Sequence, residues 1–396
     1  MTTIKIREIG DVKMCRRILK NQTTTNPADV PFYKISTFGG TAENYILWNT
    51  YREYRNKYPF PKIGSILISA AGTIGRTVIY RGEDAYFQDS NIVWVDNDET
   101  KVLNSFLYYA FKLSNWRTTN GSTIKRLYSD NILDLDLDLD LDLDIPYFDK
   151  KAQQEISNML SILDEKISVN RSIIATTEKL LREVYEYWFV QFDFPDEKGR
   201  PYKTSGGEMV YSEELKRDIP KNWGIAKIGD YLNEHSKSSV KVNDVNDGNK
   251  GEIPFYTSGE DILPYNESFV DGLNTFLNTG GNAGVKTHYG KAAYSTDTYC
   301  IDFGNYTAYI SQYLKYILPN MNTLFFAGSG LKHLQKGALK SHKIVAPDIV
   351  IANKYNDIVT ESEKTISALI RENNKLVELR DWLLPILMNG QAKVQD

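Results

Sequence analysis

Apolar residues between Ile156 and Trp188 recur at alternating spacings of four and three, the pattern of a helix with one buried stripe. The stripe is long enough to be a heptad seam rather than one face of a globular helix. Asn170 and Thr177 interrupt it, and a polar seam residue commonly fixes the register and the partner of a coiled coil. The seam consists of Ile156, Leu160, Leu163, Ile167, Asn170, Ile174, Thr177, Leu181, Val184 and Trp188.

A second, less regular stripe predicts another long helix near the end of the sequence. Its residues are Ile366, Leu369, Asn373, Leu376, Leu383 and Leu387. At 1.5 Å per residue, a helix of about 35–40 residues spans roughly 50–60 Å. Because each of the two helices carries one such seam, we expect the helices to pair with each other. The alternative is that each amphipathic helix packs on its own domain.

The remaining sequence is typical of short strands separated by turns. Aromatic and β-branched runs such as SILISAAGTIGRTVIY, NIVWVD and TYCIDF are punctuated by glycine. Helices are expected near residues 104–117 and 306–318. These segments therefore predict mixed α/β modules that are mostly strand.

The chain repeats itself in order. IREIGDVK near the start is echoed by IAKIGDYL at 225, VPFYKIST at 30 by IPFYTSGE at 253, and NGSTIKRL at 120 by AGSGLKHL at 327. A weaker match joins the stretches that begin at 70 and 279. A unit of about 200 residues is too long for a solenoid repeat, so we infer two copies of one module. The predicted divisions are a module at 1–149, a helix at 150–190, a linker at 191–222, a module at 223–348 and a helix at 349–392.

Charge separates these parts further. The net charge is −4, but residues 1–128 carry 18 Lys and Arg against 11 Asp and Glu, whereas residues 129–220 carry 11 against 21. The first segment could face a polyanion, and the second would be repelled by one.

The overall composition, 41% hydrophobic and 25% charged, is that of a globular protein. Neither a membrane-length apolar run nor a signal-peptide core is evident. Cys15 and Cys300 lie far apart and lack metal-ligand spacing. We expect reduced, buried thiols in a cytoplasmic protein.

Residues 133–144 read LDLDLDLDLDLD. On a strand, this alternation would place all leucines on one face and all carboxylates on the other. The step from Leu127 to Pro146 takes 19 positions, whereas the matching step from Leu334 to Pro347 takes 13. The six extra residues equal three dipeptides, which indicates an expanded strand or turn. A metal site is the alternative, but carboxylates about 6.6–6.8 Å apart are too widely spaced for one ion with Ca–O distances of about 2.3–2.6 Å.

Two strings resemble parts of enzymes. FFAGSG at 325–330 fits a methyltransferase pattern that binds S-adenosylmethionine, but its repeat partner lacks that pattern. LDEK at 163–166 could be half of a nuclease site, yet it falls in mid-heptad, where a solvated helix face is expected. The four histidines are all in the second module without close pairing: His235, His288, His333 and His342. We therefore predict no catalytic residues, no cofactor and no metal site.

Polar loops that carry cations beside aromatic residues are better candidates for chemistry. Glycine lets backbone approach a surface closely, Arg and Lys suit phosphates or guanine edges, and Gln and Asn suit adenine. Ordinary surface loops are the alternative, but recurrence at matching places in both modules favours DNA contact. The predicted DNA-binding residues are Arg76, Gln88, Asn91, Lys125, Arg126, Lys286, His288, Lys332 and His333.

Over essentially its whole length the chain resembles the specificity (S) subunits of type I restriction-modification systems. The sharpest likeness is the stretch from QQEISNML at 153 to KIGDYL at 232, which is similar to the family's first conserved helix and linker. The resemblance implies an α/β (α+β) fold, in which two duplicated target recognition domains are separated by two long antiparallel coiled-coil spacer helices.

The same resemblance implies partners. Each domain would read half of a split site in double-stranded DNA, and the helices would act as a ruler and dock two modification subunits. Restriction subunits would join to form the nuclease, and the S subunit itself would not be catalytic. One departure is IPYFDKKAQQ, where the family often has adjacent prolines. Two alternatives stay open: the same role in a related fused restriction-methylation system, or a coiled-coil adaptor whose modules bind protein.

Overall fold

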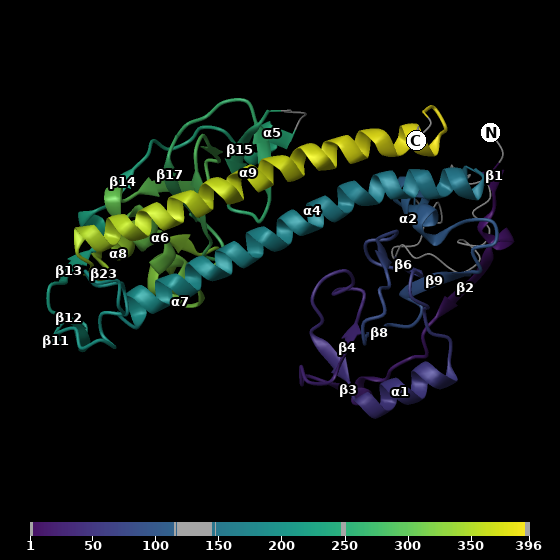
Figure 1. Cartoon of the computed structure of the whole chain (residues 1–396), viewed down its shortest axis with the longest axis horizontal. Helices are drawn as coiled ribbons and strands as arrows, with labels where there is room; N and C mark the ends of the chain where they lie inside the picture. The colour runs from purple at the N-terminus through teal and green to yellow at the C-terminus, as the bar shows by residue number, and fades with distance from the viewer. Residues whose placement is uncertain (1–2, 115, 117–144, 147, 247–250, 393–396) are drawn as a thin grey trace. The chain divides into compact units, whose positions relative to one another are not determined.

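The computed structural model describes residues 3–114, 116, 145–146, 148–246 and 251–392 (Figure 1). It divides into two compact units. Unit 1 comprises Met1–Lys166 with Leu376–Asp396, and unit 2 comprises Ile167–Lys375. Lys125, Arg126 and the Leu-Asp run lie outside the described residues. Within those residues, no helix is both long and apolar enough to cross a membrane.

Among its described residues, unit 1 has two four-stranded sheets and two short α-helices. The first sheet has the order β2–β9–β6–β7 and is antiparallel throughout, and the second has the order β3–β5–β4–β8, with β4 and β8 parallel. The strands are β2 (Gly10–Met14), β3 (Thr23–Thr24), β4 (Val30–Tyr33), β5 (Asn44–Ile46), β6 (Ile66–Ser69), β7 (Thr77–Ile79), β8 (Tyr86–Phe87) and β9 (Ile92–Asn97). The helices are α1 (Trp48–Lys57) and α2 (Asn104–Leu113), and the short strands β1 (Thr3–Ile4) and β10 (Ile145–Pro146) pair with each other.

Unit 2 repeats this plan. Its four-stranded sheet has the order β14–β20–β17–β18, and its second sheet has the order β16–β15–β19, with β15 and β19 parallel. The strands are β13 (Gly224–Lys227), β14 (Asn233–Glu234), β15 (Ile253–Tyr256), β16 (Ile262–Tyr265), β17 (Leu273–Asn278), β18 (Val285–Tyr289), β19 (Ala293–Tyr294), β20 (Thr298–Asp302), β21 (Phe326–Ala327), β22 (His333–Leu334) and β23 (Lys343–Ala346). The helices are α5 (Val242–Asn246), α6 (Thr307–Tyr316), α7 (Leu318–Phe325) and α8 (Lys336–Ser341).

The repeats of the sequence therefore correspond to repeated structure. VPFY forms β4 and IPFY forms β15, and each pairs with one antiparallel and one parallel neighbour. Likewise, the pairing of β1 with β10 is matched by that of β13 with β23, and α2 by α6. The prediction of two duplicated α/β domains is confirmed.

Two long helices accompany the modules. They are α4 (Lys150–Tyr185), which a π-helical turn extends over Glu186–Val190, and α9 (Ile349–Met388). In unit 2 they run antiparallel, because Asn170 meets Asn373 whereas the Leu181 carbonyl accepts a hydrogen bond from the Tyr355 hydroxyl at 3.2 Å. In unit 1, Ile156 and Leu160 of α4 share a core with Leu384 and Leu387 of α9.

The predicted seam residues are all buried or half-buried. Those that are buried are Ile156, Leu160, Ile167, Asn170, Leu181, Ile366, Asn373 and Leu387. Those that are half-buried are Leu163, Ile174, Thr177, Val184, Trp188, Leu369, Leu376 and Leu383.

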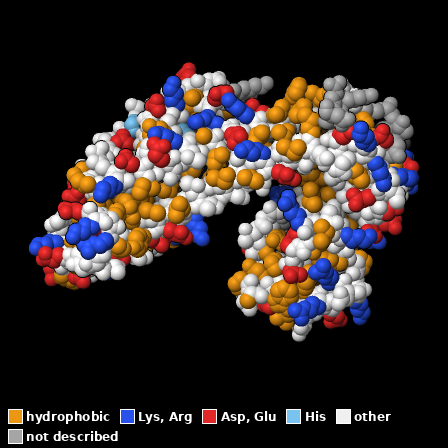
Figure 2. All heavy atoms as spheres, in the orientation of Figure 1, with side chains coloured by type: hydrophobic (Ala, Val, Ile, Leu, Met, Phe, Trp, Pro, Cys, Tyr) orange, Lys and Arg blue, Asp and Glu red, His pale blue; other side chains and the backbone are white. Residues whose placement is uncertain are grey.

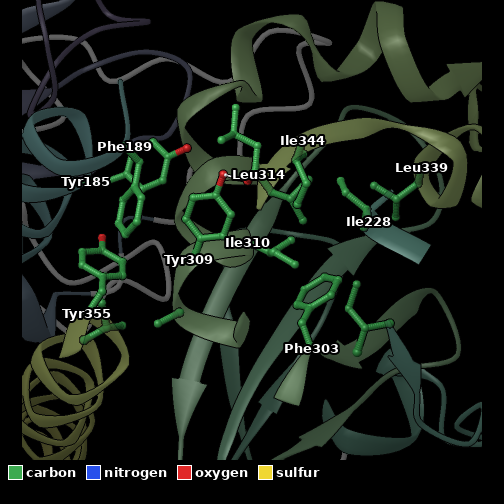
Figure 3. Packing of buried hydrophobic residues seen from close by; sticks show 14 of the residues in the cluster. Tyr185, Phe189, Ile228, Phe303, Tyr309, Ile310, Leu314, Leu339, Ile344 and Tyr355 are labelled. Carbon is green, nitrogen blue, oxygen red and sulfur yellow. Dashed lines mark hydrogen bonds between the residues drawn. The ribbon is translucent and has the colours of Figure 1, made fainter. Parts of the chain in front are cut away.

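An aromatic cluster attaches the end of α4 to the second module. Tyr185 and Phe189 pack against Tyr309 of α6, with ring centroids 6.0 and 4.6 Å apart, and Tyr355 of α9 closes the cluster (Figure 3). Burying aromatic side chains of this size dominates core energetics. The helix end is thus part of the module's core.

The predicted linker is more ordered than a plain surface connection. It contains a hairpin of β11 (Met209–Ser212) and β12 (Arg217–Pro220), and Phe194 stacks on Trp223 with ring centroids 4.7 Å apart. The linker therefore belongs to the core of unit 2, which the Gly, Pro and charge content of the sequence did not indicate.

Candidate nucleic-acid interface

The loop between β6 and β7 carries Arg76, the first predicted DNA contact. It folds back on Ser69, whose hydroxyl oxygen accepts the Arg76 backbone N–H at 2.8 Å and whose carbonyl accepts that of Gly75 at 3.0 Å. Gly75 has a φ of +81°, and a Cβ there would lie 2.1 Å from Cδ1 of Trp116, so only glycine fits. The exposed Arg76 side chain donates from Nη1 to the Phe38 carbonyl at 2.7 Å. One part of the guanidinium holds the neighbouring loop, and the rest can meet a phosphate or a guanine edge.

Gln88 and Asn91 lie just after β8. The side-chain oxygen of Gln88 accepts the Ile35 backbone N–H at 3.0 Å. Because bidentate contact with adenine uses both the oxygen and the nitrogen of an amide, Gln88 in this arrangement orders a loop instead. Asn91 is half-buried and follows Ser90, which has a positive φ of 53°. It stays a candidate.

The described repeat partner of the string holding Lys125 and Arg126 lies in unit 2. There β21 and β22 pair antiparallel, and the Lys332 carbonyl accepts the Gly281 N–H at 2.9 Å. Lys332 and His333 are both exposed. The loop between β17 and β18 and the loop before β22, far apart in sequence, thus form one surface of glycines and cations.

Lys286 requires a correction. Its ammonium group donates to the Thr257 carbonyl at 2.9 Å and also to that of Gly259. Burial lowers the pKa of Lys286. Since the charge is committed to two carbonyls of its own module, the predicted DNA contact is not the role that this geometry supports. Lys286 ties down the loop after β15.

The prediction for His288 was wrong. His288 is only 3% exposed, so its side chain cannot face a ligand at the surface. Nδ1 lies 3.0 Å from the Ser367 hydroxyl oxygen of α9, and burial lowers the pKa of the imidazole. His288 is a packing residue between β18 and α9.

The FFAGSG string does not have the geometry of a cofactor loop. α7 ends at Phe325, and residues 328–332 connect the antiparallel strands β21 and β22. A glycine loop that binds a nucleotide in a Rossmann unit instead follows a strand and opens a helix.

The expectation of a solvated face at LDEK was wrong for Asp164. Its carboxylate lies 2.7 Å from Nη1 of Arg380 and 3.3 Å from Nζ of Lys112, and it accepts the Tyr109 hydroxyl at 3.0 Å. Burial alone would raise the pKa of Asp164, but Arg380 and the other partners hold it below its ordinary value. The sequence analysis missed this group, although Asp164 borders the seam residue Leu163.

Both cysteines are buried free thiols, as expected. Burial raises the pKa of Cys15 to about 12 and also raises that of Cys300. In the described ranges, no group of three or more His, Cys, Asp or Glu side chains is arranged to hold a metal ion.

The family model of the type I restriction modification DNA specificity domain matches residues 1–179 and 220–379. The chain belongs to this family. The two matched stretches each contain one module and most of one long helix, so the family's domain occurs twice here. Membership agrees with the resemblance seen in the sequence.

Two relatives are also specificity subunits by name. One, from Haemophilus influenzae, is provisionally named a type I restriction enzyme specificity subunit and is 57% identical over 129 residues, which are 33% of this chain and 33% of that protein. The chain thus matches a third of that relative's length. The other is the type I restriction enzyme MjaIX specificity subunit of Methanocaldococcus jannaschii, 23% identical over 368 residues, with 85% of this chain and 79% of that protein covered.

A solved structure shares the fold. It is the S subunit of a type I restriction-modification system from M. genitalium, with a TM-score of 0.58 and 18% identity. The match covers 98% of this chain and 95% of that one. At this identity the likeness establishes the architecture of the specificity family and nothing finer.

Proposed function

We propose that the chain is the DNA-reading subunit of a type I restriction-modification complex and recognises a bipartite site, one half with each module. The duplicated topology carries this proposal. Two copies of one α/β module, each with a glycine-bearing loop and exposed cations such as Arg76 and Lys332, suit two separate segments of DNA. Phosphate and guanine contacts are the chemistry that such cations provide.

The second part of the proposal is that the long helices dock two modification subunits. α4 carries a further apolar stripe besides the seam that faces α9. Within unit 2 its members are exposed and recur at spacings of four and seven: Val169, Ile173 and Leu180. A hollow of about 340 Å³ beside Val169 and Ile173 indents this face of the helix. An amphipathic helix of a partner would bury this stripe.

In this proposal the chain supplies recognition, and the modification and restriction subunits supply chemistry. The structure around FFAGSG supports assigning the chemistry to the partner subunits. The string leads into a connection between two antiparallel strands, whereas a cofactor loop would open a helix. No particular contact favours a fused restriction-methylation system or a protein adaptor over this assignment.

Genome-wide methylation calling tests the proposal. The chain would be expressed with its modification partner in a host that lacks other methyltransferases. We expect methylation, by family resemblance on adenine, at one motif with two specific halves around a non-specific gap. A continuous motif of about four to six base pairs, or no methylation that depends on this chain, would contradict it.

A further inference from the structure

Each module contains one further loop that the fold builds in the same way. In unit 1 it follows β2, and in unit 2 it follows β14, in both cases the edge strand that opens the four-stranded sheet. A buried tyrosine anchors each loop: the Tyr86 hydroxyl donates to the Arg16 carbonyl at 2.9 Å, and the Tyr294 hydroxyl donates to the Ser236 carbonyl at 2.7 Å. Tyr86 lies on β8 and Tyr294 on β19, the strands that pair in parallel with β4 and β15.

Both loops present exposed cations. They are Arg16, Arg17 and Lys20 in the first module, and Lys237 and Lys241 in the second. In the part of the chain that the structure describes, none of these five pairs with a carboxylate. By contrast, many other exposed lysines do, such as Lys216 with Glu213 at 2.9 Å.

In the first module a second element adds charge to the loop. Arg16 lies 5.2 Å from the centre of the Tyr58 ring, and Lys57, the last residue of α1, lies 5.7 Å from the same centre. Both cations therefore lie near one half-buried ring, and an anion bound beside it would be attracted by each of them. Figure 2 shows Lys and Arg side chains over the α1 end of this module.

In the second module the loop borders a hollow of about 350 Å³. Hydroxyl, imidazole and ammonium groups line most of it, with two aromatic rings completing the wall: His235, Ser236, Lys237, Ser238, Ser239, Phe269 and Tyr294. Nε2 of His235 lies 3.1 Å from the Asp302 carboxylate and Ser238 is buried, so the free donors here are the exposed serines and Lys237. Such donors bind phosphate oxygens without reading the base.

We propose that these two loops grip the phosphate backbone of double-stranded DNA beside each half-site. The contacts involve residues 16–20 with Lys57 in the first module and residues 236–241 in the second. This inference rests on the proposed function and deepens it, because it separates backbone contact from the base-reading loops that hold Arg76 and Lys332. Recurrence of the anchor and of the unpaired cations in both modules is its main support.

The salt dependence of DNA binding tests the inference. The full chain with its modification partner would bind a duplex containing the methylated motif over a series of salt concentrations. Each phosphate contact contributes about 0.9 to the slope of log affinity against log salt. The double variants Arg16→Ala/Lys57→Ala and Lys237→Ala/Lys241→Ala should each lower the slope by about two and leave the motif unchanged.

A matched control removes two charges that already have partners. Lys216→Ala/Lys221→Ala breaks exposed pairs with Glu213 and Glu208, at 2.9 and 2.8 Å, and should keep the wild-type slope. The exchange Arg16→Lys/Lys57→Arg should also keep it, because the charges remain.

The outcomes distinguish this inference from the proposed function. If the wild-type complex methylates a bipartite motif but the loop variants keep the wild-type slope, only the backbone contact is overturned. If the loop variants instead lose the modification subunit at an unchanged slope, the loops bind protein and the inference is again overturned. If the wild-type complex fails to bind DNA, both proposals fall.

Discussion

Asp164 is held by partners from two helices at once. Arg380 comes from α9, whereas Tyr109 and Lys112 come from α2 of the first module. The side chains of Asp164 and Arg380 are 26% and 19% exposed, so water screens their attraction only in part. At this site one carboxylate links a recognition module to the long helices within unit 1.

Replacing this carboxylate should destabilise unit 1 in a pH-dependent way. Asp164→Asn removes the partly buried counter-charge of Arg380 and leaves it only the more exposed Asp381, so we expect the free energy of unfolding near pH 7 to fall by about 1–3 kcal/mol. The folded-state pKa of Asp164 lies below that of the unfolded chain. Its contribution is therefore fully present above about pH 4 and is lost as the pH falls through the folded pKa.

Urea unfolding at several pH values measures this difference. The gap between wild type and Asp164→Asn should narrow as the pH falls below 4. Glu213→Gln removes a carboxylate from an exposed pair and serves as control, with stability close to that of wild type. A gap that stays constant with pH would show that Asp164 acts through shape rather than charge.

The pairing of α4 and α9 includes a polar contact within an apolar seam. Nδ2 of Asn170 donates to Oδ1 of Asn373 at 3.0 Å and to Oε2 of Glu372 at 2.7 Å. Oδ1 of Asn170 is buried and has no hydrogen-bond partner in the described structure. A buried polar pair of this kind costs stability but disfavours other registers, in which each amide would face leucine or isoleucine.

Removing both amides should therefore be better tolerated than removing one. Asn373→Leu leaves the Asn170 amide buried with one partner fewer, and we expect a loss of about 1–3 kcal/mol. Asn170→Leu/Asn373→Leu removes both groups and should be at least as stable as wild type. A thermodynamic cycle of the singles and the double, measured by urea unfolding, should give a coupling of about 0.5–3 kcal/mol. Additive effects would mean that the two amides do not act as a pair.

Elements of the fold differ in how far the sequence predicts them. The seam of α4 was predictable because helical periodicity is a local property, and β4 and β15 were predictable as copies because their residues repeat. His288 was not, because its burial depends on Ser367 of α9, 79 positions away. The same holds for Lys286, whose two acceptors lie on another loop. Loops that carry Lys or Arg are recognisable in a sequence. Whether such a side chain is exposed or is bonded to groups of its own module depends on the tertiary packing.

The whole chain combines two units, each with its own core. One buried cluster of unit 1 joins the sheet strands β6 and β9 to α2 and to the ends of both long helices. One buried cluster of unit 2 joins α6, β20 and the linker to the other parts of the same helices. Since α4 and α9 belong to both units, a partner bound along them could affect both modules.

The isolated chain should bind DNA weakly and neither bind S-adenosylmethionine nor cleave DNA. Its net charge is −4, and only parts of its surface carry unpaired cations, so long-range attraction to a polyanion is small. Gel-shift titrations with the motif duplex should show tight binding only after the modification subunit is added. Calorimetry with S-adenosylmethionine and the chain alone should show no stoichiometric binding. Stoichiometric uptake of the cofactor by the chain alone would contradict the assignment of chemistry to its partners.

The two modules should read their half-sites independently. Their cores are separate, and changes at sites with no shared partners usually add. Lys332→Ala/His333→Ala should thus weaken or relax one half of the methylated motif by about 1–3 kcal/mol per lost base contact, and leave the other half intact. Arg76→Ala should affect the opposite half, as should Lys125→Ala/Arg126→Ala, which the sequence predicts at the equivalent place.

Methylation calling for each variant reads both halves at once, and Lys216→Ala serves as the control. With two modules on paired helices, the half-sites should lie about one helical turn apart in every variant. A variant of one module that relaxed both halves equally, while the protein stayed folded, would mean that the modules share a single binding surface.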